Sequence, residues 1–290
     1  MVTRIAVVAD IHHGRDTFTK RGTAALGLLD DFIDGVNAGS FDAVIDLGDR
    51  ISDETAERDV ALQRQVANGF HRLGNKPRHH VIGNHDLALL SADQNAVILD
   101  APMHTRSAII GEHRLVFWQP DVSLTAERGL FLKDGDLDAL EKVLNDDDRP
   151  TLLISHVPLS GHAQTGNYYF ERNPGHATYA ENAEIRSVMA RAPCPLIALA
   201  GHVHWNTLTM VDGTAHLTLQ SLTETFTTGE PAASTAVIEI DGDEFRWTVR
   251  GLDRVSVTLP WPKVKPQWRP VLNAFSDMKV DPTAKFASNA

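Results

Sequence analysis

Residues 5–12 read IAVVADIH, a short apolar run that ends on an acidic residue. The apolar part, residues 5–9, is too short for a buried helix and is rich in β-branched side chains. It therefore predicts a buried β-strand. Such a strand would place Asp10 and His12 together at its carboxyl end, where two side chains that can bind a metal follow directly.

The rest of the amino-terminal region repeats this arrangement with helices in between. Apolar runs at residues 43–47 and 79–82 predict two more buried strands, and each ends at a glycine. Apolar residues at spacings of three and four predict helices over residues 19–38 and 54–73. The first 85 residues therefore alternate strand and helix, which indicates βαβ units and a mainly parallel sheet.

The second half of the chain favours antiparallel pairing. The dipeptide DG at residues 212–213 and again at 241–242 separates runs of alternating apolar residues, as in a β-hairpin. A third hairpin is expected between residues 107–110 and 115–118. Further elements expected in this half are strands at residues 151–154 and 196–200 and a helix at residues 136–144.

The composition narrows the kinds of site that the chain can build. It has 290 residues with 27 Lys and Arg, 38 Asp and Glu, 14 His and one Cys, so its net charge is −11 with neutral His. One Cys excludes an internal disulfide framework and a Cys-rich zinc or iron–sulfur site. The acidic balance disfavours a protein that coats nucleic acid through a broad basic face. Any metal site would use imidazole, carboxylate and amide ligands.

Neither a membrane span nor a signal peptide is expected. No apolar run reaches the roughly 18–20 residues that cross a bilayer, and the apolar run at the start is too short for a secretory signal. We therefore expect a cytoplasmic protein. The catalytic domain would cover residues 1–259. Residues 260–290 hold prolines at 260, 262, 266 and 270 and Trp at 261 and 268, and we expect an arm that packs on the body or on another subunit of a homo-oligomer.

Five predicted strands run directly into side chains that can bind a metal. In open α/β sheets the carboxyl ends of the strands form the ligand-binding edge, so these residues should converge. Each motif alone is weak, because a D-x-H pair is common and G-D after a strand is usually a turn. Five in succession favour a site for Zn, Mn or Fe. The residues are Asp10, His12, Asp49, Asn84, His85, Asp86, His156, His202 and His204.

These motifs resemble those of the calcineurin-like metallophosphoesterases. The family pattern is D-x-H, G-D, G-N-H-[DE], H and G-H-x-H, and here it reads DIH at 10–12, GD at 48–49, GNHD at 83–86, His156 and GHVH at 201–204. In its length and in the Val-Pro that follows His156, the sequence is most similar to the bacterial class III cyclic-nucleotide phosphodiesterase and glycerophosphodiesterase group. The resemblance implies a four-layer α/β/β/α sandwich, with two mixed β-sheets flanked by helices.

The resemblance also implies a binuclear centre of two divalent ions, Mn, Fe or Zn. A carboxylate shared by both ions holds them about 3.5–4 Å apart, and together they turn a bridging water into a hydroxide nucleophile near neutral pH. The implied ligands are Asp10, His12 and His204 for one ion, Asn84, His156 and His202 for the other, and Asp49 as the bridge.

The remaining roles concern the phosphate and the leaving group. The resemblance implies that His85 faces the scissile phosphate and protonates the leaving oxygen, which accelerates such reactions by roughly 10²–10⁴-fold. Asp86 would either hold His85 protonated and oriented or cap a helix, and both readings stay open. Asn84 and His85 are expected to bind substrate, and His13, next to a predicted ligand, is expected to line the same pocket.

The stretch at residues 160–180 is Gly-rich, aromatic and polar, and it leaves a strand end beside the predicted metals. Long loops of this kind in compact domains are usually functional or disordered. We expect it to shape the substrate pocket, and a surface excursion or a subunit contact is the alternative. The residues expected to contribute are His162, Tyr168, Tyr169, Phe170 and Arg172.

The function expected from these features is the hydrolysis of a small phosphodiester, with phosphomonoesters as further substrates. A nuclease is disfavoured by the net charge, since long nucleic acids need a basic track. A non-catalytic scaffold of the same fold would usually lack some ligands, and none is missing here. A phosphoprotein phosphatase would carry G-D-x-V-D-R-G where this chain reads GDRISD.

Overall fold

Two six-stranded β-sheets form the centre of the protein in a computed structural model that describes residues 2–162, 164–261, 264–265 and 274. Both sheets contain parallel and antiparallel pairs. In spatial order the first sheet contains β12 (Val255–Pro260), β11 (Glu244–Arg250), β10 (Thr235–Asp241), β1 (Thr3–Val8), β2 (Ala43–Asp46) and β3 (Arg78–His80). The second contains β4 (Arg106–Ile110), β5 (His113–Phe117), β6 (Thr151–Ile154), β7 (Leu196–Ala200), β9 (Thr214–Thr218) and β8 (Thr207–Val211).

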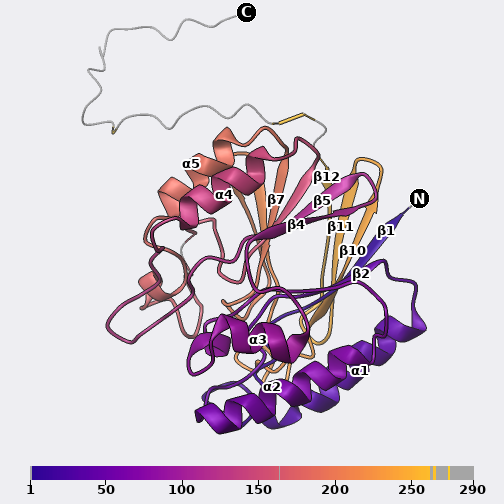
Figure 1. Cartoon of the computed structure of the whole chain (residues 1–290), viewed down its shortest axis with the longest axis vertical. Coiled ribbons are helices and arrows are strands. Elements are labelled where there is room, and N and C mark those ends of the chain that lie inside the picture. Colours follow the sequence, from indigo (N-terminus) through magenta and orange to yellow (C-terminus); the bar gives the residue numbers. More distant parts are fainter. Residues whose placement is uncertain (1, 163, 262–263, 266–273, 275–290) are drawn as a thin grey trace, which may run out of the picture.

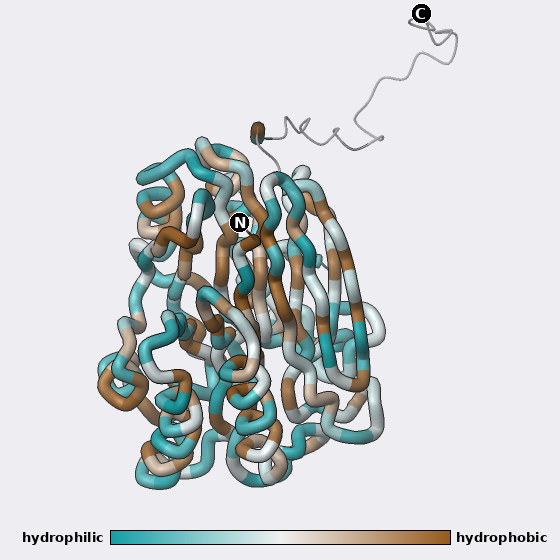
Figure 2. Tube along the Cα trace, turned by 90° about the vertical axis from the view of Figure 1, so that its right-hand side faces the viewer, coloured by the Kyte–Doolittle hydropathy of each residue, from teal (hydrophilic) through white to brown (hydrophobic). Residues whose placement is uncertain are grey.

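Helices cover the outer faces of the two sheets (Figure 1). On one side lie α1 (Ala25–Ala38) and α2 (Ala56–His71), with the shorter α3 (Ala92–Leu99) beside α2. On the other side lie α4 (Asp136–Asn145) and α5 (Asn182–Arg191). Short 3₁₀ helices occur at Gly22–Ala24, His85–Leu87 and Pro174–His176. The strands stand side by side and carry long hydrophobic stretches (Figure 2).

Three apolar clusters separate the four layers. The central one lies between the sheets and joins side chains such as Val7 and Ile45 of the first sheet to Phe117 and Leu199 of the second. A second cluster packs α4 and α5 against the second sheet, and a third packs α1 and α2 against the first. The expected four-layer α/β/β/α sandwich is therefore confirmed.

The strand directions bring the chain's polar strand ends to one edge. β1, β2 and β3 are mutually parallel, and so are β5, β6, β7 and β9. Beyond the strands the first sheet continues as backbone contacts, because the N–H of Asp10 donates to the carbonyl of Gly48 and that of His12 to the carbonyl of Asp49. The loops after β1 and β2 are thus held side by side.

Helix α5 and strand β12 are among the elements that the sequence analysis did not predict. Helix α5 buries only Ile185, Val188 and Met189, and its first residue has no side-chain cap, so its apolar signal is short. Strand β12 lies at the edge of its sheet, where only β11 pairs with it. It ends at Pro260, and an edge strand tolerates proline because one side of its backbone needs no partner.

The expected carboxyl-terminal arm lies mainly outside the described residues. Its first Trp, Trp261, is buried and packs against Phe245 and His113 in the cluster between the sheets. The apolar packing of the core therefore continues past residue 259, where the catalytic domain was expected to end. No described helix is long and apolar enough to span a membrane.

A buried ion-pair network ties the ends of β2 and β3 together. The Arg50 guanidinium lies 2.7 Å from Asp46 and 2.8 Å from Asp86, and it donates to the carbonyl of Val81. Asp46 also accepts a hydrogen bond from His80 Nδ1 at 2.8 Å. Removal of either partner of a buried ion pair is destabilising, because it leaves an uncompensated charge in a medium of low dielectric constant.

We expect Arg50→Met to lower the free energy of unfolding of the metal-free protein by about 3–5 kcal/mol, because two buried carboxylates lose their counter-ion. Arg72→Met is the matched control, since Arg72 also pairs with two carboxylates, Asp30 and Asp34, but in solvent. Such exposed pairs contribute about 0–1 kcal/mol. Urea denaturation followed by circular dichroism measures both values, and equal losses for the two variants would contradict this account.

Candidate metal centre

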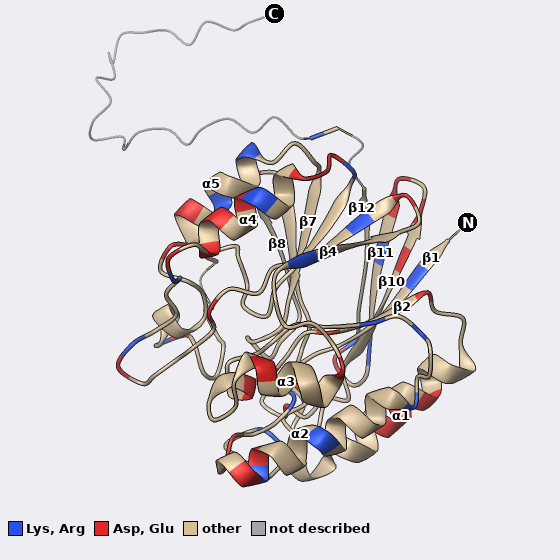
Figure 3. Ribbon diagram, viewed as in Figure 1, with Lys and Arg blue, Asp and Glu red and all other residues tan. Residues whose placement is uncertain are grey.

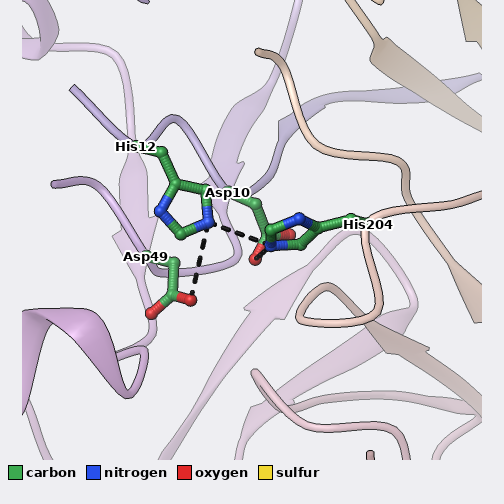
Figure 4. A group of neighbouring side chains, drawn as sticks. All are labelled: Asp10, His12, Asp49 and His204. Carbon is green, nitrogen blue, oxygen red and sulfur yellow. Dashed lines mark hydrogen bonds and ion pairs between the residues drawn. The ribbon is translucent and has the colours of Figure 1, made fainter. Parts of the chain in front are cut away.

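Side chains from the ends of five strands in both sheets converge on one point. They form two groups that could each hold a cation, and Asp49 belongs to both. Figure 4 shows how the side chains of the first group point toward one another. The first group is Asp10, His12, Asp49 and His204, and the second is Asp49, His156 and His202.

The imidazole–carboxylate distances in the first group suit ligands of one ion better than hydrogen-bonded pairs. His204 Nε2 lies 2.9 Å from His12 Nε2 and 3.7 Å from Asp10 Oδ1. His12 Nε2 lies 3.8 Å from Asp49 Oδ2. Two ligand atoms at about 2.0–2.2 Å from a common ion are separated by about 3–3.5 Å. The imidazole–carboxylate distances are near that separation and too long for a hydrogen bond.

The second group approaches the same carboxylate from the other sheet. His156 Nε2 lies 3.5 Å from Asp49 Oδ2, and it lies 3.2 Å from Asn84 Oδ1. Oδ2 of Asp49 therefore faces an imidazole of each group, while Oδ1 accepts a hydrogen bond from the backbone N–H of His85. A carboxylate oxygen in this position can be shared between two ions.

Three imidazoles are oriented by a hydrogen bond through their other ring nitrogen. His156 Nδ1 donates to the carbonyl of Leu47, and His202 Nε2 donates to the carbonyl of His176. His204 Nδ1 donates to Glu224 Oε2 at 2.9 Å. Metal-binding histidines typically have such a partner, because it fixes the tautomer and leaves the second nitrogen free for the ion.

The electrostatics also fit a cation. Burial, together with the charge of Asp49, raises the pKa of Asp10 well above its usual value. Burial would raise the pKa of Asp49 too, but His156 and His85 bring it well below the usual value. Within the described residues neither carboxylate has a Lys or Arg within ion-pair distance. Two close, buried carboxylates without a Lys or Arg partner are an environment that a divalent ion stabilises.

The imidazoles are prepared for coordination in different ways. Burial lowers the pKa of His12 and His204, and it lowers that of His202 to about 3, so these rings are neutral and can bind metal. Burial would lower the pKa of His156 as well, but the neighbouring carboxylates Asp49 and Asp10 raise it to about 9. An ion in the second group would have to displace this proton.

The backbone at these positions is strained. Nine non-glycine residues of the described chain have a positive φ, and five of them belong to the two groups. Such conformations cost of order 1–3 kcal/mol each, and they persist where the surrounding structure enforces them. The five are Asp10 and His12 (both 49°), Asp49 (52°), His204 (58°) and His202 (69°).

Two glycines of the sequence motifs are required because a carboxylate lies very close to each of their Cα atoms. A Cβ atom on Gly83 would lie 2.1 Å from Asp49 Oδ1, and one on Gly201 would lie 2.6 Å from Asp10 Oδ2. Any side chain at either position would displace the carboxylate. The glycine of GNHD and that of GHVH are thus part of the candidate centre.

His85 lies beside the two groups, with Asp53 as its carboxylate partner. Its Nδ1 donates to Asp53 Oδ1, and its ring packs edge-on against His12. Asp86 does not contact the His85 side chain. Instead it accepts hydrogen bonds from the backbone N–H groups of Gly83, Asp49 and Arg50, so neither expected role of Asp86, partner of His85 or helix cap, describes it.

A pocket of about 390 Å³ opens over the metal-binding groups. One wall is apolar and includes Phe18, Leu124 and Ala126. The loop at residues 160–180 supplies Tyr169, Phe170, Asn173 and His176, so part of its expected contribution is present. The polar wall consists of Lys20, Asp49, Asn84, His85, His202 and His204.

Four residues expected at the pocket lie elsewhere. His13 is buried behind the site and donates to Gln65 Oε1 at 2.6 Å. His162 lies at a separate small cavity. Tyr168 and Arg172 do not line the pocket, and the Tyr168 ring stacks on Phe226 instead. Proximity in sequence misled here, because adjacent side chains have different surroundings: His12 belongs to the first metal-binding group and His13 bonds to Gln65, while Tyr169 lines the pocket and Tyr168 stacks on Phe226.

Asp53, Lys20 and Glu224 are the charged site residues that the sequence analysis missed, and it did not predict the apolar wall either. Glu224 had a signal, since β9 runs into the polar stretch QSLTET at 220–225 just as the other strands run into ligands. Asp53 and Lys20 had none. Both lie several residues beyond a strand end, and only the paths of their loops bring them to His85.

Comparisons with known proteins agree with this fold. A dimetal phosphatase from Danio rerio superposes with a TM-score of 0.70 at 16% identity over 90% of this chain and 99% of its own. A purple acid phosphatase from yellow lupin (Lupinus luteus) seeds superposes with a TM-score of 0.64 at 15% identity over 90% of this chain and 54% of its own. No curated protein sequence matches significantly. The profile of the calcineurin-like phosphoesterases matches residues 3–206, and the chain belongs to this family.

Proposed function

We propose that this protein hydrolyses small phosphodiesters, and phosphomonoesters more slowly, at a centre of two divalent ions. The observation that supports the proposal best is the pair of metal-binding groups that share Asp49. Enzymes that cleave phosphate esters with two ions need them about 3.5–4 Å apart, and a shared carboxylate produces that spacing. Family membership supports the same reaction class.

The proposed ligands follow the two groups. When bound, Mn, Fe or Zn ions would neutralise charge on the phosphoryl oxygens and lower the pKa of a water molecule. Asn84 is added to the second ion because its Oδ1 lies beside His156 Nε2. One ion would be held by Asp10, His12 and His204, the other by Asn84, His156 and His202, and Asp49 would bridge them.

His85 is the proposed general acid. His85 lines the pocket, and its Nδ1–H is held by Asp53, so the ring is oriented by a carboxylate. The exposed fraction of the His85 side chain is 28%, which leaves it accessible to a leaving group. Transfer of the Nε2 proton to the leaving oxygen would avoid release of an unstable alkoxide.

The pocket favours a diester of modest size. Its volume of about 390 Å³ is in the range of small-molecule sites, about 300–1,000 Å³. The apolar wall of Phe18, Leu124 and Ala126 can accommodate the second ester group, which a monoester lacks. The aromatic ring of Phe170 lies against His202, so this apolar surface extends to the candidate metal centre.

Two other functions find less support. A nuclease would need a band of basic residues, whereas Lys and Arg are interspersed with Asp and Glu on α2, α4 and α5 (Figure 3). Among the residues that line the pocket, Lys20 is the single Lys or Arg. A non-catalytic scaffold would have no use for the strained backbone that holds both metal-binding groups in place.

Removal of metal should abolish hydrolysis. We expect chelator-treated protein to lose turnover of bis-p-nitrophenyl phosphate and to recover it with Mn, Fe or Zn. Asp49→Ala should reduce the bound metal from two ions per chain to less than one, because both groups lose a ligand. Asp53→Asn is the control and should retain both ions. Elemental analysis measures the content, and metal-independent turnover would refute the proposal.

Gly83→Ala should reduce metal binding, as should Asp49→Ala. The added Cβ would collide with the carboxylate at 2.1 Å, so we expect lower metal content and a large loss of activity. Gly27→Ala in α1 is the matched control, because its Cβ meets no atom within 4 Å. Metal titration by calorimetry compares the two variants. Equal metal affinity in both would show that the close approach does not matter.

His85→Gln should keep both ions and lose rate. For a diester with an alkyl leaving group we expect kcat to fall by about 10²–10⁴-fold. For a p-nitrophenyl ester the fall should be much smaller, since that leaving group needs no proton. Asp53→Asn should also lower kcat for the alkyl diester, but by a smaller factor than His85→Gln. A uniform loss for both leaving groups would mean that His85 acts on binding or positioning and not as an acid.

A further inference from the structure

Lys20 is a buried cation at the wall of the pocket. Its exposed fraction is 6%, and it lies in the connection between β1 and α1. The only hydrogen bond of its Nζ among the described residues is a long one of 3.4 Å to His85 Nε2. Within the same residues no carboxylate oxygen lies within 4.0 Å of Nζ. An ammonium group has three protons to donate, so most of this capacity is unused.

The position of Lys20 is enforced by its surroundings. The backbone N–H of Lys20 donates to the carbonyl of Thr17, and that of Arg21 donates to the carbonyl of Thr223. Thr225 Oγ1 donates to the carbonyl of Thr19 at 2.7 Å. The segment at residues 223–225 also carries Glu224, which orients His204. The ammonium group is therefore placed by the same backbone that holds a candidate metal ligand.

The charge of Lys20 is only partly compensated by the protein. Burial lowers its pKa, and the more distant carboxylates Asp49, Asp53 and Glu224 oppose this effect without cancelling it. Burying a cation without a close partner is costly, and proteins seldom retain one that has no role. An anion in the pocket would supply the missing partner.

We propose that Lys20 Nζ binds a non-bridging phosphoryl oxygen of the substrate. Lys20 Nζ and His85 Nε2 lie 3.4 Å apart, and both residues line the pocket. Nζ can donate to Nε2 only while Nε2 carries no proton, so a protonated Nε2, as in the proposed acid, leaves the ammonium group to an anion. This spacing allows His85 to contact the leaving oxygen of one phosphoryl group while Lys20 contacts a neighbouring oxygen. The inference rests on the proposed function in one respect, because it takes the anion to be a phosphate.

Two alternatives for Lys20 predict different behaviour. If it served only to hold His85 in place, its loss would lower kcat for esters and leave the affinity for inorganic phosphate unchanged, since phosphate has no leaving group. If it served only the fold, its loss would lower the free energy of unfolding. Phosphate binding therefore separates the proposed contact from both.

The experiment is isothermal titration calorimetry of inorganic phosphate into the metal-loaded protein. We expect Lys20→Met to weaken phosphate binding by about 10- to 100-fold, the usual effect of losing a charge-assisted hydrogen bond. Lys20→Arg should recover part of the affinity, because it restores the charge with a different shape. The control Lys142→Met removes an exposed lysine from α4 and should bind like the wild type.

Metal content and urea unfolding are measured on each variant, and Lys20→Gln is used if Lys20→Met unfolds. A Kd within about twofold of the wild type, at equal metal content, would overturn the proposal, and so would a wild type that does not bind phosphate. Lys20-dependent phosphate binding by a protein that hydrolyses no ester would support this inference while refuting the proposed function.

Discussion

The hydrogen bonds accepted by the Asp86 carboxylate are the constraint on which the candidate site depends. Its two oxygens receive backbone N–H groups from Gly83, Asp49 and Arg50, and one also pairs with the Arg50 guanidinium. They join the loop after β2 to the loop after β3. Asp49 is held so that one oxygen meets the His85 backbone and the other faces both metal-binding groups. A buried carboxylate that does not line the pocket thus sets the position of Asp49, which does.

The candidate ligands could be predicted from the sequence because each follows a buried strand, and the carboxyl ends of parallel strands lie together. A local pattern of strand and polar residue therefore indicates which distant residues meet. Asp10 and His204 are 194 positions apart, yet each follows a buried strand, and strand ends of this fold meet at one edge. Contacts made by loops have no such rule. Asp53 and Lys20 reach His85 through turns whose course depends on tertiary packing, so the sequence offered the adjacent Asp86 instead, as a partner of His85 or as a helix cap.

The difference between local sequence patterns and loop contacts also explains which helices and edge strands could be predicted. The amphipathic pattern of α1 and α2 is long, so their existence was predictable, although α1 begins at Ala25 and not near residue 19. Residues 20 and 21 are drawn away by hydrogen bonds to Thr17 and Thr223, which no local propensity encodes. Helix α5 has three buried residues, and strand β12 is only partly buried on one face. Their sequence periodicity is therefore weak, and tertiary packing determines whether they form.

The ligands of the candidate centre come from both sheets, with Asp10, His12 and Asp49 on one and His156, His202 and His204 on the other. A bound ion would therefore act as a non-covalent cross-link that closes a loop of nearly two hundred residues. Because only the packed sandwich presents the full ligand set, free metal ions favour the folded state by mass action. The supply of metal would then govern the lifetime of the protein in the cell as well as its chemistry, and a chain deprived of ions would be the one more readily opened and degraded.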